Sequence, residues 1–110
     1  MDNHNINIRV YLDNEKMPEH IQWNAGESDS PQHAKAVLLS LWDGNEKTAL
    51  RIDLWTKKMM VDEMNDFFFQ TLMTLADTYG RATRNAELPE EMKAFAREFK
   101  KKADMALDEN

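Results

Sequence analysis

The 110-residue chain has no cysteine, only three glycines and three prolines, and no long apolar run. Without cysteine, disulfides, thiolate metal sites and thiol catalysis are excluded. The glycines stand alone at positions 26, 44 and 80, so no glycine-rich phosphate loop is present. No segment approaches the roughly 20 apolar residues of a membrane span, and the N-terminus lacks the basic start and apolar block of a signal peptide. We therefore expect a soluble cytoplasmic protein without direct membrane insertion.

Few residues are suited to chemistry. The formal net charge is −6, which disfavours nucleic acid because affinity for phosphates depends mostly on Lys and Arg. The histidines, His4, His20 and His33, are widely spaced and form no pair at ligand spacing, so no metal site is expected. Ser40 is a nucleophile on paper, but the sequence places no histidine near it. We expect no catalytic residues, no cofactor and no enzyme activity.

The first 25 residues read as two strands. Apolar and polar residues alternate over residues 6–12, the period of a half-buried strand. The polar stretch 13–16 ends it as a turn, and Pro18 prevents early resumption. Ile21 and Trp23 then indicate a short second strand.

The segment from Pro31 to Trp42 allows two interpretations. Ser30 and Pro31 could cap and begin a helix, with apolar residues at helical spacing behind them. Alternatively, residues 36–42 form a strand that pairs with residues 49–55 across the turn 43–46. We prefer the strand because residues 49–55 have a plain β pattern; a single-turn helix over residues 31–34 is compatible with it.

The hairpin pattern specifies its own register. If Leu41 pairs with Leu50, six aliphatic residues lie on one face of the hairpin, and we expect the helices to cover this face. They are Val37, Leu39, Leu41, Leu50, Ile52 and Leu54. The opposite face then carries a mixed set: Leu38, Ser40, Trp42, Arg51, Asp53 and Trp55. A slip of one residue would mix the two faces.

The mixed face has two interpretations. Tryptophan and arginine are enriched at interfaces, so these six residues are our candidate partner-binding site, with a symmetric homodimer as one form of it. Alternatively, the face is ordinary surface, where the stem of Arg51 covers a tryptophan ring and Asp53 makes a cross-strand pair.

Two long helices follow the strands. Val61, Met64, Phe68, Leu72, Leu75 and Tyr79 form the apolar stripe of the first. The second begins at Pro89, and its inward stripe is Met92, Phe95, Phe99, Ala103 and Ala106. Strands first and helices afterwards predict an α+β fold, in which a four-stranded antiparallel sheet precedes two long α-helices packed on one face. The length predicts a single domain over residues 1–110.

Two features of the first helix leave alternatives open. Phe67, Phe68 and Phe69 span about 200° of a helix, so one of them meets another chain unless the second helix covers the far side; we favour burial within the chain. Methionines between Met59 and Met73 are typical of gap-filling core. They also suit a small apolar-ligand or chaperone-like binding domain, our alternative function.

The chain resembles a known family in several stretches. These are AKAVLLSLWD (34–43), LRIDLWTKKMMVDEMNDFF (50–68), IRVYLDNEKMPEHIQW (8–23) and ADTYGRAT (76–83). They resemble the gliding motility-associated GldC family of Bacteroidetes over roughly residues 5–84. That family has an Asp and a Pro where this chain has Lys58 and Met60. The resemblance implies a small accessory protein that works with gliding or cell-envelope machinery, and it implies no catalytic residue.

Overall fold

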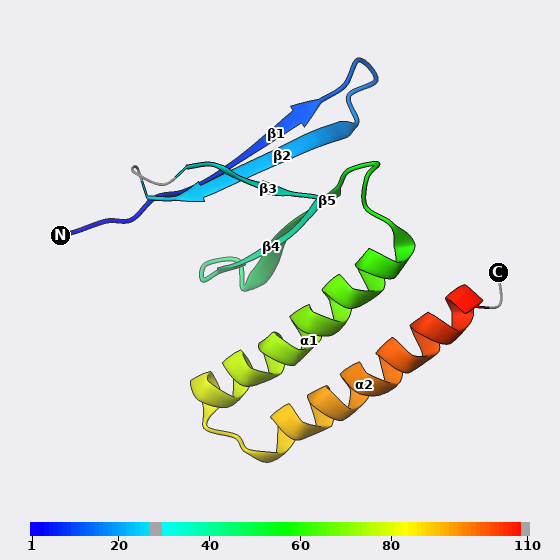
Figure 1. Ribbon diagram of the computed structural model, residues 1–110. Coiled ribbons are helices and arrows are strands. Elements are labelled where there is room, and N and C mark those ends of the chain that lie inside the picture. The colour runs from blue at the N-terminus through cyan, green and yellow to red at the C-terminus, as the bar shows by residue number, and fades with distance from the viewer. Residues whose placement is uncertain (27–29, 109–110) are drawn as a thin grey trace. The chain divides into compact units, whose positions relative to one another are not determined.

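The chain folds as two compact units, which are described separately. The computed structural model describes residues 1–26 and 30–108, and it divides into Met1–Met59 and Met60–Asn110. The first unit holds the strands and the second holds two helices (Figure 1). The α+β class is therefore confirmed, while the single domain stays a prediction.

Three strands form the first sheet in the order β1-β2-β3, all antiparallel. They are β1 (Ile6–Leu12), β2 (Pro18–Ala25) and β3 (Gln32–Ala34). Val10 pairs with Ile21, and Ile21 pairs with Ala34, so apolar residues of all three strands share one face. Ile21 lies at the centre of this face and is only 1% exposed. This central strand is therefore the anchor of the sheet.

The remaining strands, β4 (Ala36–Asp43) and β5 (Thr48–Trp55), form a separate two-stranded antiparallel sheet. The predicted single four-stranded sheet is wrong. The reason lies at Lys35, the one residue between β3 and β4, where the chain changes sheets. Its carbonyl accepts hydrogen bonds from the backbone N–H and the hydroxyl of buried Thr56, at 2.8 and 3.2 Å. A bend of this kind is how one extended segment serves two sheets.

The strand interpretation of residues 36–42 is confirmed, whereas the single-turn helix over residues 31–34 is wrong. That segment is β3, where His33 pairs with Gln22 and Gln32 pairs with Trp23. Pro31 therefore precedes a strand instead of beginning a helix. A proline is tolerated just before an edge strand because its missing N–H removes no ladder hydrogen bond there.

The second unit is an antiparallel helix pair, α1 (Val61–Thr83) and α2 (Glu87–Asp108) (Figure 1). The Glu63 carboxylate accepts a hydrogen bond from the Met60 N–H at 3.1 Å and so satisfies a donor before the first turn of α1. Arg84, with φ 59°, ends α1 in the left-handed conformation. The Asn85 side chain accepts the N–H groups of Glu87 and Leu88 at 3.0 and 2.9 Å. This cap starts α2 two residues before the predicted Pro89.

Small residues bring the two helices together. Among the described residues of this unit, those that are buried are Ala76 of α1 and Pro89 and Ala96 of α2. Six residues of the predicted apolar stripes lie outside this contact and are exposed: Val61, Phe68, Leu75, Tyr79, Phe95 and Ala106. Helices in close contact leave room only for small side chains between their backbones, so the large side chains of these stripes lie at the flank of the pair.

The aliphatic face of the β4–β5 hairpin is not buried by the hairpin itself. Leu41, Leu50 and Ile52 are each more than half exposed, although the register that brings them together is the predicted one. In a two-stranded ladder a side chain has only its cross-strand and diagonal neighbours for contact, which is too few to bury a leucine. The hairpin alone therefore does not bury this face, and its coverage by the helices stays a prediction.

Candidate functional site

The candidate site lies on the β4–β5 hairpin, which a tight turn holds in register. The Asp43 carboxylate accepts hydrogen bonds from the N–H groups of Asn45 and Glu46, at 2.9 and 3.3 Å. Lys47 then adopts φ 54°, and its N–H donates to the Asp43 carbonyl at 2.8 Å. An aspartate that bonds to backbone groups two or three residues ahead is a standard turn former. The turn fixes Asp43 opposite Thr48 and thereby sets all later pairs.

The predicted register is confirmed: Leu41 pairs with Leu50. The ladder also pairs Leu38 with Asp53 and Ser40 with Arg51, while Trp42 pairs with Ala49 and Ala36 pairs with Trp55. Since side chains alternate between the faces of a strand, one face carries all six candidate residues. We call this set the mixed face: Leu38, Ser40, Trp42, Arg51, Asp53 and Trp55.

Arg51 and Asp53 form an ion pair at the centre of the mixed face. They are two residues apart on β5, so the pair runs along one strand and does not cross to the neighbouring strand as the alternative interpretation had it. The Arg51 Nη2 lies 3.0 Å from Asp53 Oδ1, and its Nε lies 3.4 Å from Oδ2. Both side chains are about half exposed. Two parallel N–H···O contacts hold the guanidinium in one plane, which fixes its direction on the surface.

The two tryptophans occupy opposite ends of the mixed face. Trp42 stands beside the turn and Trp55 at the open end of the hairpin, six positions apart along the ladder. At about 3.3 Å per residue this separation is roughly 20 Å. They are 68% and 60% exposed, which is high for the most costly apolar side chain to leave in water. A single small molecule does not reach both rings.

The first sheet brings together two histidines that the sequence left apart. The rings of His20 and His33 lie 4.7 Å apart between centroids, and Tyr11 lies 5.8 Å from His20. Little in the sequence indicates this contact, because β3 is only three residues long and follows Ser30 and Pro31. Over residues 1–26 and 30–108, no group of three or more His, Asp or Glu is placed to hold a metal ion.

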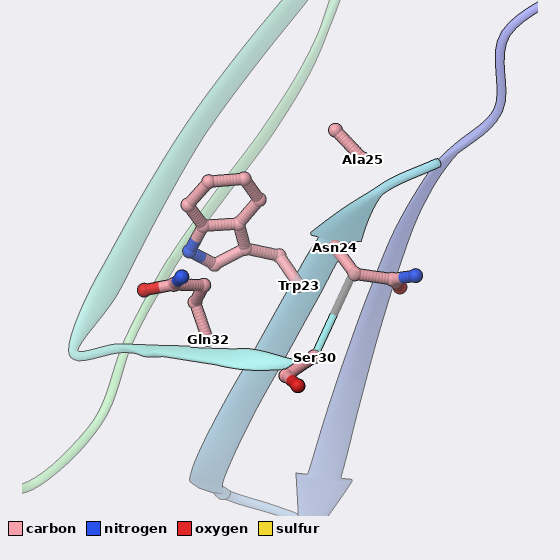
Figure 2. A pocket seen from close by; sticks show the side chains of 5 residues that line it. All are labelled: Trp23, Asn24, Ala25, Ser30 and Gln32. Atoms are coloured by element: carbon pink, nitrogen blue, oxygen red, sulfur yellow. The ribbon is translucent and has the colours of Figure 1, made fainter. Parts of the chain in front are cut away.

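A pocket of about 270 Å³ lies at the end of β2, lined by Trp23, Asn24, Ala25, Ser30 and Gln32. Figure 2 shows the Trp23 indole beside the Gln32 side chain, its cross-strand partner, while Asn24 points away from them. Trp23 is the remaining tryptophan of the chain and belongs to the other sheet from Trp42 and Trp55. It therefore provides an independent aromatic surface for comparison.

Two further hollows lie on the helix pair, of about 310 and 390 Å³. Their linings are mostly apolar, and both include Phe95. Neither is lined by the methionines between Met59 and Met73. The ligand-binding alternative therefore gains no support from these two hollows and stays a prediction. Within the described part of the chain, no helix combines the length and apolar character needed to cross a membrane.

Comparison with known proteins places the chain in a family. A family model described as gliding motility-associated protein GldC-like matches residues 18–105 and so covers both units. No curated protein and no solved structure matches the chain. The resemblance noted in the sequence is thus confirmed at the level of the family.

Proposed function

The chain belongs to the GldC-like family of gliding motility-associated proteins, and we propose that it is a non-enzymatic accessory protein that binds a protein partner through its mixed face. One observation carries the proposal. The β4–β5 register places two exposed tryptophans on the same face as an oriented Arg51–Asp53 pair. The partner belongs to the gliding or cell-envelope machinery, and the protein works in the cytoplasm.

The tryptophans are the proposed anchors. An aromatic side chain buries a large area with few rotatable bonds, so it gives much binding energy for little lost entropy. Trp42 and Trp55 lie roughly 20 Å apart, since they are six positions apart along the ladder. An extended strand or a helix of the partner, laid along the hairpin, contacts both. A compact ligand contacts one.

The ion pair is proposed to set orientation. Because Arg51 and Asp53 satisfy each other at 3.0 Å, the centre of the face has a fixed dipole and no net charge. Long-range steering by that pair is therefore weak, and the partner is selected by hydrogen-bond geometry at close range. The association rate is expected to change little with ionic strength, unlike that of complexes formed between oppositely charged surfaces.

The experiment is a pull-down from native cell lysate with the tagged full-length chain. The wild type is compared with the double variant Trp42→Ala/Trp55→Ala and with a matched control, Trp23→Ala, which removes a tryptophan from the other sheet. Circular dichroism confirms that each variant is folded. We expect a partner that the wild type and the control retain and that the double variant loses.

Recovery of the same partner by the double variant would contradict the proposal and move the search away from the mixed face. Loss with the Trp23→Ala control alone would point to the first sheet instead. Arg51→Glu separates the two proposed roles, because it replaces the ion pair with two like charges while both anchors remain. It is expected to reduce recovery of the partner without abolishing it.

A further inference from the structure

The helix pair has two unlike flanks. On one flank Lys93 lies 2.7 Å from Asp77, and Lys100 lies 3.1 Å from Asp66, so two ion pairs join α2 to α1. A residue two positions along a helix from one of these charged residues points in a direction about 200° away around the helix axis. Such residues are Phe68 and Leu75 on α1 and Phe95 on α2. The polar groups thus gather on one flank and large apolar side chains on the other.

We call the second side the apolar flank: Phe68, Leu72, Leu75, Leu88, Phe95 and Phe99. One ring contact connects the two helices here, since the centroid of Phe99 lies 6.5 Å from that of Phe68 on α1. Phe95, also on α2, lies 6.4 Å from Phe99. Leu72 of α1 lines the same hollow as Leu88 and Phe95 of α2. The flank is therefore one continuous surface built from both helices.

Within the second unit, the apolar flank is largely exposed. Phe95 is 61% exposed, and Phe68, Leu75 and Leu88 are 39%, 50% and 41% exposed. A fully exposed aromatic residue has an area of roughly 150–250 Å². The exposed area of the apolar flank is therefore on the order of 500 Å² per chain. A standard interface buries about 800 Å² on each partner. The flank thus supplies most of the area that a stable dimer needs.

Shape and charge on α2 indicate what covers it. Phe95 projects between two hollows, one lined by Glu91 and the other by Phe99 and Lys102. Acidic Glu91 lies toward the N-terminal end of α2 and basic Lys102 toward the C-terminal end. They are eleven residues apart, or about 16 Å along the helix, so they do not meet within one chain. A second α2 running in the opposite direction brings each to the other.

We propose that the protein forms a symmetric homodimer in which α2 packs antiparallel against α2 of a second copy through the apolar flank. A two-fold axis near residues 96–97 seats each Phe95 in the hollow at Phe99 of the partner subunit. Glu91 then lies beside Lys102 of the partner subunit, and by symmetry the contact occurs twice. The result is a four-helix bundle made from two helix pairs. This surface is separate from the mixed face, so the inference does not depend on the proposed function.

The Glu98 carboxylate lies 3.9 Å from the Lys102 ammonium within each chain. In the dimer Lys102 therefore sits between Glu98 of its own chain and Glu91 of the other. A cation flanked by two carboxylates at the rim of an apolar contact favours the antiparallel arrangement over the parallel one. Parallel packing would place the two Glu91 residues side by side, and like charges would repel.

The test is the mass of the full-length chain by sedimentation equilibrium over about 1–100 µM, a range that covers micromolar dissociation constants. We expect a species of twice the 12.9 kDa chain mass. Phe95→Glu is expected to give a folded monomer over this range. Glu91→Lys and Lys102→Glu are each expected to weaken dimerisation about tenfold or more, because each change disrupts two symmetric contacts.

The combined variant Glu91→Lys/Lys102→Glu decides the geometry, since it restores attraction only if the two residues meet across the interface. We expect its dissociation constant to return to within about threefold of that of the wild type. Glu90→Lys/Lys101→Glu is the matched control: the residues have the same spacing, lie away from the apolar flank, and are expected to leave dimerisation unchanged.

Three results would overturn the proposal. One is a wild-type chain that remains monomeric at about 100 µM, a concentration at which even weak dimers form. In that case, a lower melting temperature of Phe95→Glu would mean that the flank is covered from within the same chain. The others are a dimer that persists in Phe95→Glu, and a combined charge-swap variant as weak as the single ones.

Discussion

Gly80 of α1 lies directly against Pro89 of α2: a Cβ on Gly80 would approach the Pro89 Cγ to 3.0 Å. Because Pro89 is buried and its ring is rigid, this neighbour does not yield easily. The two residues meet where the end of α1 lies beside the start of α2, and the missing side chain of the glycine permits this contact.

Gly80→Ala is therefore expected to lower the free energy of unfolding by about 1 kcal/mol. Alanine gains about 1 kcal/mol of helix propensity over glycine, but overpacking a close contact costs about 1–3 kcal/mol. Urea denaturation measures the difference. Gly44→Ala is the control, since a Cβ there meets nothing within 4 Å. A stabilised Gly80→Ala would mean that α2 shifts freely at Pro89.

Ile21 is the side chain on which the first sheet depends. Ile21→Ala is expected to lower the free energy of unfolding by about 2–5 kcal/mol, because the removed atoms are fully buried and leave a cavity. Ile8→Ala on the same face is the comparison. Ile8 is partly exposed, so its loss is expected to cost clearly less. Equal effects of the two changes on thermal or urea unfolding would contradict Ile21 as the centre of that core.

The mixed face is expected to matter little for stability. Arg51→Ala and Trp55→Ala are each expected to change the free energy of unfolding by less than about 1 kcal/mol, because both side chains are largely exposed. Thermal unfolding of the purified variants is the measurement. A much larger loss from either would identify the residue as core and would remove the basis for a partner-binding face.

Asp13 makes the stability of the first unit depend on pH in the acidic range. Its carboxylate accepts hydrogen bonds from the N–H groups of Met17 and Glu15 and pairs with Lys57 at 3.2 Å. The Met17 hydrogen bond is the largest cause that holds the pKa of Asp13 below its ordinary 3.8, assisted by Lys57 and opposed by desolvation. A lowered folded-state pKa means that the stabilisation is present above pH 3.8 and is lost as the pH falls through the folded value.

Asp13→Asn is therefore expected to flatten the fall in melting temperature below about pH 4, because the amide keeps an acceptor oxygen but does not titrate. Scans from about pH 2 to 6 measure it. Lys57→Met is the matched variant: it removes the ion pair and leaves the backbone hydrogen bonds, so most of the acid dependence is expected to remain. Loss of the dependence in Lys57→Met would give the ion pair the main role instead.

The local pattern of the chain predicted its elements well, and its sheets poorly. The period of two in β1 and β5, the turn at Asp43 and the Leu41–Leu50 register all follow from neighbours in sequence, and the structure confirms them. The division into two sheets depends instead on a hydrogen-bonded bend at one residue, Lys35. A backbone bend of that kind leaves no mark in hydrophobic periodicity.

The helices illustrate the same limit. Their existence and approximate ends were predictable from spacing, dipole-favourable charges and the glycine near the end of α1. Which stripe faces the other helix was not, because Ala76 and Ala96 carry little hydrophobic signal but permit the closest approach. The large residues instead lie beside the contact between the two helices. For the mixed face, the sequence predicted which residues lie on the same side of the hairpin. The separation of roughly 20 Å between the tryptophans follows only from the observed strand pairing.

The two flanks of the helix pair are sensitive to different properties of a salt. Any salt screens the partly exposed ion pairs between Lys93 and Asp77 and between Lys100 and Asp66, and so weakens one flank. Sulfate, which is excluded from protein surface, strengthens apolar contact and so tightens the other. At equal ionic strength both salts screen the ion pairs alike, so the helix pair is expected to be more stable in sulfate than in chloride.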